Sequence, residues 1–327
     1  MTSDTKKINE RNIDISPDFS GLIKHIVRCN LWLPAAKSLK DEKNGFLKYF
    51  TLPGRWAWDI FFFEKNGLIK KNGRCFPDVR FCEKIPKVYT DTKKLLGSTI
   101  GKMGEFEKLV LRDEKEFWDG FPYDLYNLDF TGTLFPDEQP PFSDTFESIN
   151  KIIEKHVASN FFPFVIFLTM KALKIQTKEE AIDKLKENIE TNRANNEFTE
   201  QINNLIPNTE NFVNSSFVDF ILISIPKIIC YLAKDQCNVE IITRAKYYRR
   251  NPTTRAEYFI VTFIFKFKNK RRRDLSIRNE NYNKNVLNIF RLDNVQTIDN
   301  RPMNKREIEN SLDEITKYIS SFSVGGG

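Results

Sequence analysis

Asp129 and Phe130 close an apolar run in residues 123–133, YDLYNLDFTGT. The run predicts the end of a buried strand, followed by a loop of small residues. A carboxylate in such a position can act at the mouth of a ligand site, because open α/β sheets bind ligands outside the carboxyl ends of their strands. The same pattern also fits an aspartate that only marks where a strand stops. The residues at the other predicted strand ends help to decide between these two interpretations of Asp129.

A turn between two predicted elements offers a second candidate group. Residues 45–54, GFLKYFTLPG, predict a short strand followed by a turn at Pro53 and Gly54, and residues 55–67 predict the next helix. A turn with a glycine lets a ligand reach the backbone N–H groups at the start of that helix. A plain strand-to-helix turn without a ligand is the alternative interpretation.

Two further acids are predicted at strand ends. Residues 79–83, VRFCE, indicate a strand that ends at Glu83, and residues 106–113, FEKLVLRD, indicate one that ends at Asp113. Together with Asp129, three carboxylates would then follow successive strands along the edge where such sheets bind ligands. A solvated Glu83 and an Asp113 that only caps or turns the chain are the alternatives.

Strands and helices alternate along most of the chain. Residues 162–170 predict a further buried strand, and residues 238–250 and 256–268 predict two strands around a short polar turn. This order predicts an α/β fold, with a mostly parallel sheet, a C-terminal antiparallel hairpin and helices on both faces. The remaining helices are predicted at 87–97, from 144, from 178 and at 305–322.

The predicted organisation has three parts. Residues 1–45 form an N-terminal arm, residues 46–270 form the α/β domain, and residues 271–327 form a basic loop and a helix. No internal repeat and no linker rich in proline or serine separates these parts in the sequence. The α/β domain therefore carries the predicted site.

The composition argues against several classes of protein. Of the 327 residues, 40% are hydrophobic and 29% are charged, as expected of a soluble globular protein. The first twenty residues are polar and mixed in charge, which predicts no signal peptide. The longest apolar runs are far shorter than the roughly 20 residues that cross a bilayer. We therefore expect a cytoplasmic protein without membrane contact.

The cysteines and histidines argue against a metal centre. Five cysteines are an odd number and include no CxxC pair, so neither a disulfide framework nor a zinc knuckle is expected. The two histidines, His25 and His156, argue against a histidine-rich metal site and against a Ser-His-Asp triad. Both imidazoles are expected on helix surfaces, and no metal is expected.

The positive charge is concentrated near the predicted hairpin. Residues 240–280 contain twelve lysines and arginines against four acids, whereas the whole chain has a net charge of +7. Such a local excess is typical of a surface that binds a polyanion. The candidate nucleic-acid contacts are Arg244, Lys246, Tyr248, Arg249, Arg250, Lys270, Arg271, Arg272 and Arg273.

Aromatic residues interleave with these cations. Tyr247 and Tyr248 lie between Lys246 and Arg249, so that base stacking and phosphate contacts are available together. Two alternatives remain: lysines and arginines on an edge strand that only prevent edge-to-edge pairing, and a solvated loop at KNKRRRD.

In the order of its elements the chain resembles the class I S-adenosylmethionine-dependent methyltransferases over residues 46–268. The hairpin matches the family's seven-strand plan with a reversed last strand. In that family the first strand ends in a glycine loop that holds the methionine part of the cofactor, at the place of Pro53 and Gly54 here. The second strand ends in an acid that hydrogen-bonds the ribose hydroxyls, at the place of Glu83. The resemblance implies a Rossmann-like methyltransferase sheet and S-adenosylmethionine as the cofactor.

The resemblance also implies roles for the later strand ends. Asp113 stands where the family often contacts the adenine amine, and Asp129 stands on the substrate side. NLDFTGT is similar to the Asp-Pro-Phe-Gly-Thr form of tRNA guanine-N2 methyltransferases, without its proline. Asp129 would accept a hydrogen bond from the exocyclic amine of a base, and Phe130 would stack on that base. The implied substrate is a base in DNA or RNA.

Two family motifs are absent and support an alternative hypothesis. The Gly-x-Gly-x-Gly signature is reduced to one glycine, and the Asn/Asp-Pro-Pro-Tyr tetrad is missing. The alternative is a catalytically silent methyltransferase fold that binds nucleic acid or a protein partner, as a subunit of a bacterial complex. A dehydrogenase is a third hypothesis, opposed by the hairpin and by the absent dinucleotide fingerprint.

Overall fold

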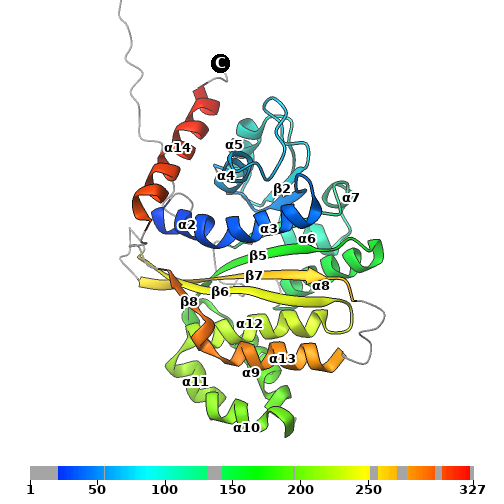
Figure 1. The fold of residues 1–327 in the computed structure, drawn as a ribbon, viewed down its shortest axis with the longest axis vertical. Helices are drawn as coiled ribbons and strands as arrows, with labels where there is room; N and C mark the ends of the chain where they lie inside the picture. The colour runs from blue at the N-terminus through cyan, green and yellow to red at the C-terminus, as the bar shows by residue number, and fades with distance from the viewer. Residues whose placement is uncertain are drawn as a thin grey trace, which may run out of the picture.

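The computed structural model describes residues 21–54, 56–130, 142–193, 196–250, 257–270, 278–298 and 304–324 (Figure 1). In these ranges the strands form one eight-stranded sheet with the order β3-β2-β1-β4-β5-β7-β6-β8. The strands are β1 Tyr49–Thr51, β2 Val79–Glu83, β3 Ile100–Met103, β4 Leu125–Asp129, β5 Phe164–Ala172, β6 Asn238–Arg250, β7 Glu257–Lys268 and β8 Gln296–Ile298.

Most neighbouring strands of the sheet are parallel. β1 lies between β2 and β4 and is parallel to both, and the outer pairs β2–β3 and β4–β5 are parallel as well. β7 runs antiparallel to its two neighbours, β5 and β6, and β8 is parallel to β6. The predicted α/β fold, with a mostly parallel sheet and an antiparallel hairpin, is therefore confirmed.

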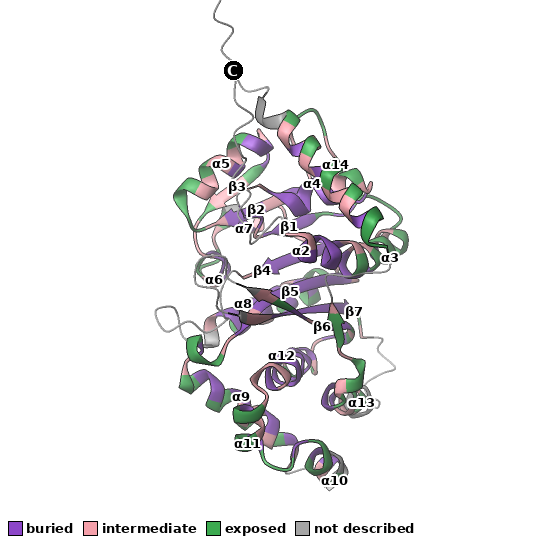
Figure 2. Ribbon diagram, turned by 90° about the vertical axis from the view of Figure 1, so that its left-hand side faces the viewer, coloured by how far each residue is buried: buried purple, intermediate pink, exposed green. Residues whose placement is uncertain are grey.

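Helices cover both faces of the sheet (Figures 1 and 2). The face that we call the α4 face carries α2 Leu22–Val27, the π-helix η1 Arg28–Trp32, α3 Leu33–Lys43, α4 Trp58–Lys65, α5 Pro86–Leu96 and α14 Lys305–Val324. The opposite α8 face carries α6 Phe106–Leu111, α7 Lys115–Trp118, α8 Phe142–Ser159, α9 Glu179–Arg193, α10 Asn196–Leu205, α11 Thr209–Ser215, α12 Phe217–Ala233 and α13 Arg278–Phe290. Two short 3-10 helices, η2 Lys174–Gln176 and η4 Leu292–Asn294, complete the described elements.

The two faces follow from the alternation of side chains along each strand. In β4, Leu125 belongs to the core of the α4 face, whereas Tyr126 and Leu128 belong to the core of the α8 face. In β5, Val165 and Phe167 pack on the α4 face in the same way. The central strands are thus apolar at nearly every position, as expected of strands that are covered on both sides. Figure 2 shows these strands buried between the two helix layers.

The prediction of a strand over residues 106–113 is wrong. Residues Phe106–Leu111 form helix α6, in which Phe106, Leu109 and Val110 pack into the core of the α8 face. Their spacing of i, i+3 and i+4 is that of a helix, but a six-residue helix gives this pattern too little length to stand out from a strand. Asp113 therefore does not follow a strand.

The third strand is β3, which the sequence did not indicate. It is short and lies at the edge of the sheet, where it pairs only with β2 among the described strands. Gly101 interrupts its apolar pattern, because the ring of Phe81 fills the space of a side chain there. A Cβ added to Gly101 would overlap that ring.

Both histidines are buried, so the prediction that they lie on helix surfaces is wrong. The His156 ring stacks on Phe164 with the centroids 3.8 Å apart. Its Nε2 lies 2.9 Å from the hydroxyl of Tyr126, and its Nδ1 lies 2.9 Å from the carbonyl oxygen of Phe161. Burial lowers the pKa of His156, and likewise that of His25, to about 3.

We predict that His156 makes folding sensitive to acid. A histidine with a normal pKa in the unfolded chain and a depressed one in the fold stabilises above pH 6.5, and this stability is lost as the pH falls toward 3. Going from about pH 7.5 to about pH 5.5 should cost about 1.4 kcal/mol for this residue. Urea unfolding at both pH values measures the loss.

His156→Phe is the matched variant for this measurement. It should be less stable than the wild type at both pH values, but should lose about 1.4 kcal/mol less on acidification, because the other ionisable groups contribute equally to both proteins. Identical losses in the two proteins would contradict the burial of a neutral His156.

Candidate functional site

The strand order reverses direction between β1 and β4. From β1 the chain continues through α4 to β2 on one side, and from β4 it continues through α8 to β5 on the other side. The carboxyl ends of two such strands leave a crevice, and this is where open α/β sheets bind ligands. The groups at these strand ends are therefore the candidate site.

Glu83 and Asp129 lie on either side of the end of β1. Thr51, the last residue of β1, pairs with Phe81 on β2 and with Asn127 on β4. Glu83 and Asp129 each follow two residues later on their own strands. Their strands are two strand spacings apart, which is roughly 10 Å. Side-chain alternation directs both acids to the α4 face. The predicted association of Glu83, Asp129 and the turn after β1 is thus present.

The turn after β1 has the geometry that its glycine suggested. Gly54 has φ of 62°, a left-handed conformation that favours glycine, and Pro53 and Gly54 are both buried. The carbonyl oxygen of Gly54 accepts a hydrogen bond of 3.0 Å from Thr92 Oγ1, which ties the turn to α5. Helix α4 begins four residues later at Trp58.

Glu83 is the half-buried acid of the site. Its Oε1 accepts a hydrogen bond of 2.9 Å from the backbone N–H of Ile85, just before α5. Burial raises the pKa of the Glu83 carboxyl, and the backbone N–H groups of Ile85 and Lys84 oppose that rise. The side chain is thus held at the tip of β2 as a hydrogen-bond acceptor.

Asp113, the third predicted acid, does not join the other two. It follows α6 on the α8 face, and its carboxylate lies 2.8 Å from the ammonium of Lys151 and 3.3 Å from that of Lys155. The side chain is 55% exposed, and the hydrogen bond from Lys151 lowers its pKa. The prediction failed because the strand on which it depended is a helix.

Asp129 is buried and forms an ion pair with Lys24 of α2. Both side chains are at most 6% exposed. Burial lowers the pKa of the Lys24 ammonium, and the charge of Asp129 opposes that effect. Sequence patterns had placed Lys24 in the N-terminal arm and gave no sign of this contact, because 105 positions separate the two residues.

Asp59 is a second buried acid on the α4 face, and the sequence patterns had not singled it out as a site residue. Its Oδ2 accepts hydrogen bonds of 2.5 Å from the hydroxyls of Tyr49 and Thr51, and of 3.0 Å from Nδ2 of Asn127. The charge of buried Arg28 lies nearby and interacts with both Asp59 and Asp129. An isolated acid within the apolar run WDIFFF was the available signal, since such an acid needs buried partners.

We call Lys24, Arg28, Asp59 and Asp129 the buried charge cluster. All four are at most 7% exposed: Lys24 and Arg28 come from the α2–η1 segment, Asp59 from α4 and Asp129 from the carboxyl end of β4. Burying an unpaired charge costs several kcal/mol, so each member depends on the others.

Phe130 does not accompany Asp129. Its backbone N–H donates to the carbonyl oxygen of Thr169 at 2.9 Å, and its ring packs against the core of the α8 face. The ring lies edge-on to Phe106 with the centroids 6.3 Å apart. Adjacent residues of a strand point to opposite faces, so a ring at 130 and a carboxylate at 129 do not share one surface.

Arg244, a predicted nucleic-acid contact, is buried inside the protein. Its Nη1 and Nη2 donate to the carbonyl oxygens of Ile289 at 2.5 Å, Asn288 at 3.0 Å and Arg291 at 2.5 Å, at the end of α13. The guanidinium therefore satisfies helix-terminal carbonyls, and the prediction of a nucleic-acid contact is not supported for this residue. The helix end could not be seen in the sequence.

The other hairpin candidates lie in different surroundings. Lys246 pairs with Asp219 at 2.9 Å, and the ring of Tyr248 is 41% exposed and lies edge-on to Phe259. Arg249 is half-buried, and its charge acts on Lys24 of the buried charge cluster. Of the remaining predictions, Arg250 ends β6 without a described side chain, and Arg271, Arg272 and Arg273 lie outside the described residues.

The basic segment is divided between two edges of the sheet. Arg249 lies near the carboxyl end of β5, on the same edge as Asp129, whereas Lys270 follows the other end of β7. A strand of twelve residues separates these ends by roughly 35 Å. Among the described residues, Arg249 and Lys270 therefore do not share one patch.

Neither a protein-family model nor any curated protein matches this chain. The fold itself defines the class, an α/β protein with a Rossmann-like sheet. In the described ranges, no helix combines the length and hydropathy of a membrane span, and no three acids, cysteines or histidines are grouped to hold a metal ion.

We predict that the ion pair of Lys24 and Asp129 is energetically coupled. Lys24→Met leaves Asp129 buried without its partner and should cost about 3–5 kcal/mol of unfolding free energy, and Asp129→Asn should cost a similar amount. The double variant should cost clearly less than the sum, as measured by urea unfolding in a double-mutant cycle. The exposed Lys184→Met serves as the control and should change stability little. Additive losses would show that the pair is not formed.

Proposed function

We propose that this chain is a methyltransferase-like protein that binds S-adenosylmethionine at the carboxyl ends of β1 and β2 and acts on a nucleic-acid base. One observation carries the proposal: the left-handed turn at Gly54 and the carboxylate of Glu83 end adjacent parallel strands at the switch point of the sheet. Both features support the proposal, because an adenosyl cofactor would use backbone N–H groups for one part of the ligand and an acid for the ribose hydroxyls.

The strand order adds support to the proposal. β7 is inserted antiparallel between β5 and β6, as in the seven-strand plan with a reversed last strand that the hairpin indicated. Fold alone does not define an activity, since one sheet architecture serves many chemistries. The proposal therefore depends on Glu83 and Gly54 rather than on topology.

The nucleic-acid part of the proposal depends on the same edge. Arg249 and the exposed ring of Tyr248 lie at the end of the hairpin that Asp129 shares. Arg249 suits a phosphate on the face of Asp129, whereas Tyr248, its neighbour on β6, points to the opposite face of the sheet. In the reaction, the amine nitrogen of the base would attack the sulfonium methyl, which leaves a thioether and a proton to be released. Lys24 would have to leave Asp129 for that acid to accept a hydrogen bond from the base.

We predict that S-adenosylhomocysteine binds the purified protein in a Glu83-dependent manner. Isothermal titration calorimetry should give saturable binding, and Glu83→Ala and Glu83→Gln should weaken it at least about tenfold, because hydrogen bonds to a charged acceptor are lost. Asp113→Ala is the matched control, since this acid lies on the other face, and should bind as the wild type does. No heat with folded protein, or equal binding by the Glu83 variants, would refute the cofactor proposal.

A second candidate function has its own observation. The ammonium of Lys24 already forms an ion pair with the Asp129 carboxylate, and both side chains are buried. An acid neutralised in this way is a structural group, which fits a catalytically silent methyltransferase fold that binds nucleic acid or a protein partner within a larger complex. The cofactor site at Glu83 is compatible with either candidate.

Transfer of a labelled methyl group separates the two candidates. An active enzyme should label RNA or DNA, and Asp129→Asn should reduce the rate by about a hundredfold, as for loss of a positioned catalytic acceptor. A silent protein should transfer no label, while retaining nucleic-acid binding that Asp129→Asn leaves intact and that substitution of Arg271, Arg272 and Arg273 abolishes. Labelling by the wild type excludes the silent candidate.

A further inference from the structure

A second basic segment of the chain surrounds helix α5. Residues 70–102 contain nine lysines and arginines against three acids. The imbalance is greater at the surface, because all three acids are half-buried, whereas five of the cations are exposed: Lys70, Arg74, Lys84, Lys87 and Lys94. Such an excess creates a positive potential that attracts anions.

Helix α5 holds two of these cations on its outer face. The helix packs against β2 and β3 (Figures 1 and 2), and its buried residues are Thr92, Leu95 and Leu96. Lys87 and Lys94 are exposed on the other side of the helix. They lie seven residues apart, which is nearly two helical turns, so they share one face with roughly 10 Å between their Cα atoms.

The cations follow the length of α5 from the candidate site onward. Lys84 comes directly after Glu83, and its charge acts on the Glu83 carboxylate. Gly97, the residue after α5, lies against the backbone of Arg74 at the other end of the helix. Cations thus stand before, along and after the helix. We call this set the α5 row: Lys84, Lys87, Lys94 and Arg74.

The two lysines on the outer face of α5 are not neutralised by the described part of the chain. The side chains of Lys87 and Lys94 form no hydrogen bond and no ion pair with any residue in the described ranges. The acid of α5, Asp91, lies between them in the sequence and is half-buried. The charges of both lysines are therefore available to a partner outside the chain.

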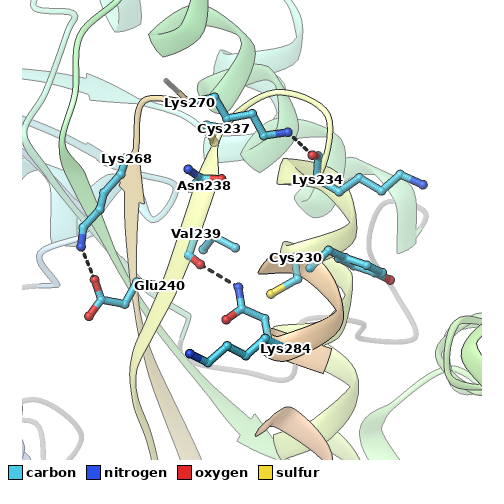
Figure 3. Close-up of a pocket in the computed structure, with 11 residues that line it drawn as sticks. Cys230, Lys234, Cys237, Asn238, Val239, Glu240, Lys268, Lys270 and Lys284 are labelled. Atoms are coloured by element: carbon cyan, nitrogen blue, oxygen red, sulfur yellow. Dashed lines mark hydrogen bonds and ion pairs between the residues drawn. The ribbon is translucent and has the colours of Figure 1, made fainter. Parts of the chain in front are cut away.

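The lysines around the cavity between α12, α13 and the hairpin are different (Figure 3). Lys268 pairs with Glu240 at 2.5 Å, and Lys270 donates to the carbonyl oxygen of Lys234. The ammonium of Lys234 lies 4.0 Å from the centroid of the Tyr231 ring. Each of these cations is held by another group of the protein, so they present no row of unpaired charge.

The surface between the lysines of α5 favours a nucleic-acid backbone as the partner. The exposed side chain between Lys87 and Lys94 is the polar Thr90. Ile85 is exposed as well, but it lies before the helix and not between the lysines. A protein partner would need an apolar centre within a polar rim, which the described outer face of α5 lacks. The phosphates of a nucleic acid are bound by spaced lysines and arginines without such a centre.

We propose that the α5 row docks the sugar–phosphate backbone of a nucleic acid. The row leads away from Glu83 at the tip of β2, so it holds a part of the strand that flanks the base at the candidate site. Contacts to phosphates position a strand without reading its sequence. The inference rests on the nucleic-acid part of the proposed function and does not depend on the cofactor part.

Fluorescence anisotropy with a mixed-sequence single-stranded oligonucleotide tests the α5 row on the full chain. The double variant Lys87→Gln/Lys94→Gln should bind about tenfold more weakly at about 0.1 M salt. The slope of log Kd against log salt concentration should fall by about 1.4, since each lost phosphate contact contributes about 0.7. Asp91→Asn should tighten binding several-fold, which a merely disruptive substitution would not do.

The double variant Lys184→Gln/Lys305→Gln is the matched control, because it removes the same charge from exposed lysines of α9 and α14. It should keep the salt slope of the wild type. Oligonucleotide binding with equal slopes in the wild type and the α5 double variant would overturn the α5 row alone. Absence of binding at about 50 mM salt would overturn both this inference and the nucleic-acid part of the proposed function.

Poly-L-glutamate separates a nucleic acid from an acidic protein as the partner. At equal concentration of charge it should displace the oligonucleotide poorly, because its flexible carboxylates do not have the charge density of a phosphate backbone. Displacement that equals self-competition by unlabelled oligonucleotide, and that is lost in Lys87→Gln/Lys94→Gln, would assign the face to an acidic protein and overturn the proposal.

Discussion

The contact between Lys24 and Asp129 is the constraint on which the other residues at the carboxyl ends of the parallel strands depend. Both side chains are buried, so each charge would cost several kcal/mol without the other. Their pairing fixes α2 over the carboxyl end of β4. Arg28, in the π-helix that follows, brings a second cation next to Asp59. Segments of π-helix are rare and often accompany functional sites, and here the segment directs both Arg28 and Trp32 into the protein.

This constraint gives the two halves of the candidate site different properties. On the β2 side, Glu83 is half-buried and keeps a carboxylate at the tip of a strand, beside the left-handed turn at Gly54. On the β4 side, Asp129 is neutralised by Lys24 and covered by a helix. Ligand binding at the first half and loss of catalysis at the second are therefore compatible within one protein. Both candidate functions follow from this difference.

Much of the fold could be predicted from the sequence, because the strands covered on both faces are long apolar runs with clear ends. The bounds of β2 and β6 agree with the predicted residues, and Gly97 follows α5 as expected. The short elements failed: α6 was mistaken for a strand, and β3 was hidden by Gly101. Of the candidate site, Glu83 and Asp129 were predicted at strand ends and lie there, and Gly54 lies in the predicted turn after β1, while their functional roles stay predictions. Lys24, Arg28 and Asp59 were not predicted as site residues, since their partners lie far away in the chain and only tertiary packing brings the charges together.

The central claim is that an adenosyl ligand binds between Gly54 and Glu83 while Lys24 stays on Asp129. A crystal structure of the protein with S-adenosylhomocysteine tests both parts in one measurement. We expect ribose hydroxyls within hydrogen-bond distance of the Glu83 carboxylate, with the Lys24–Asp129 pair intact. A ligand bound elsewhere, or crystals that remain empty at saturating ligand, would contradict it.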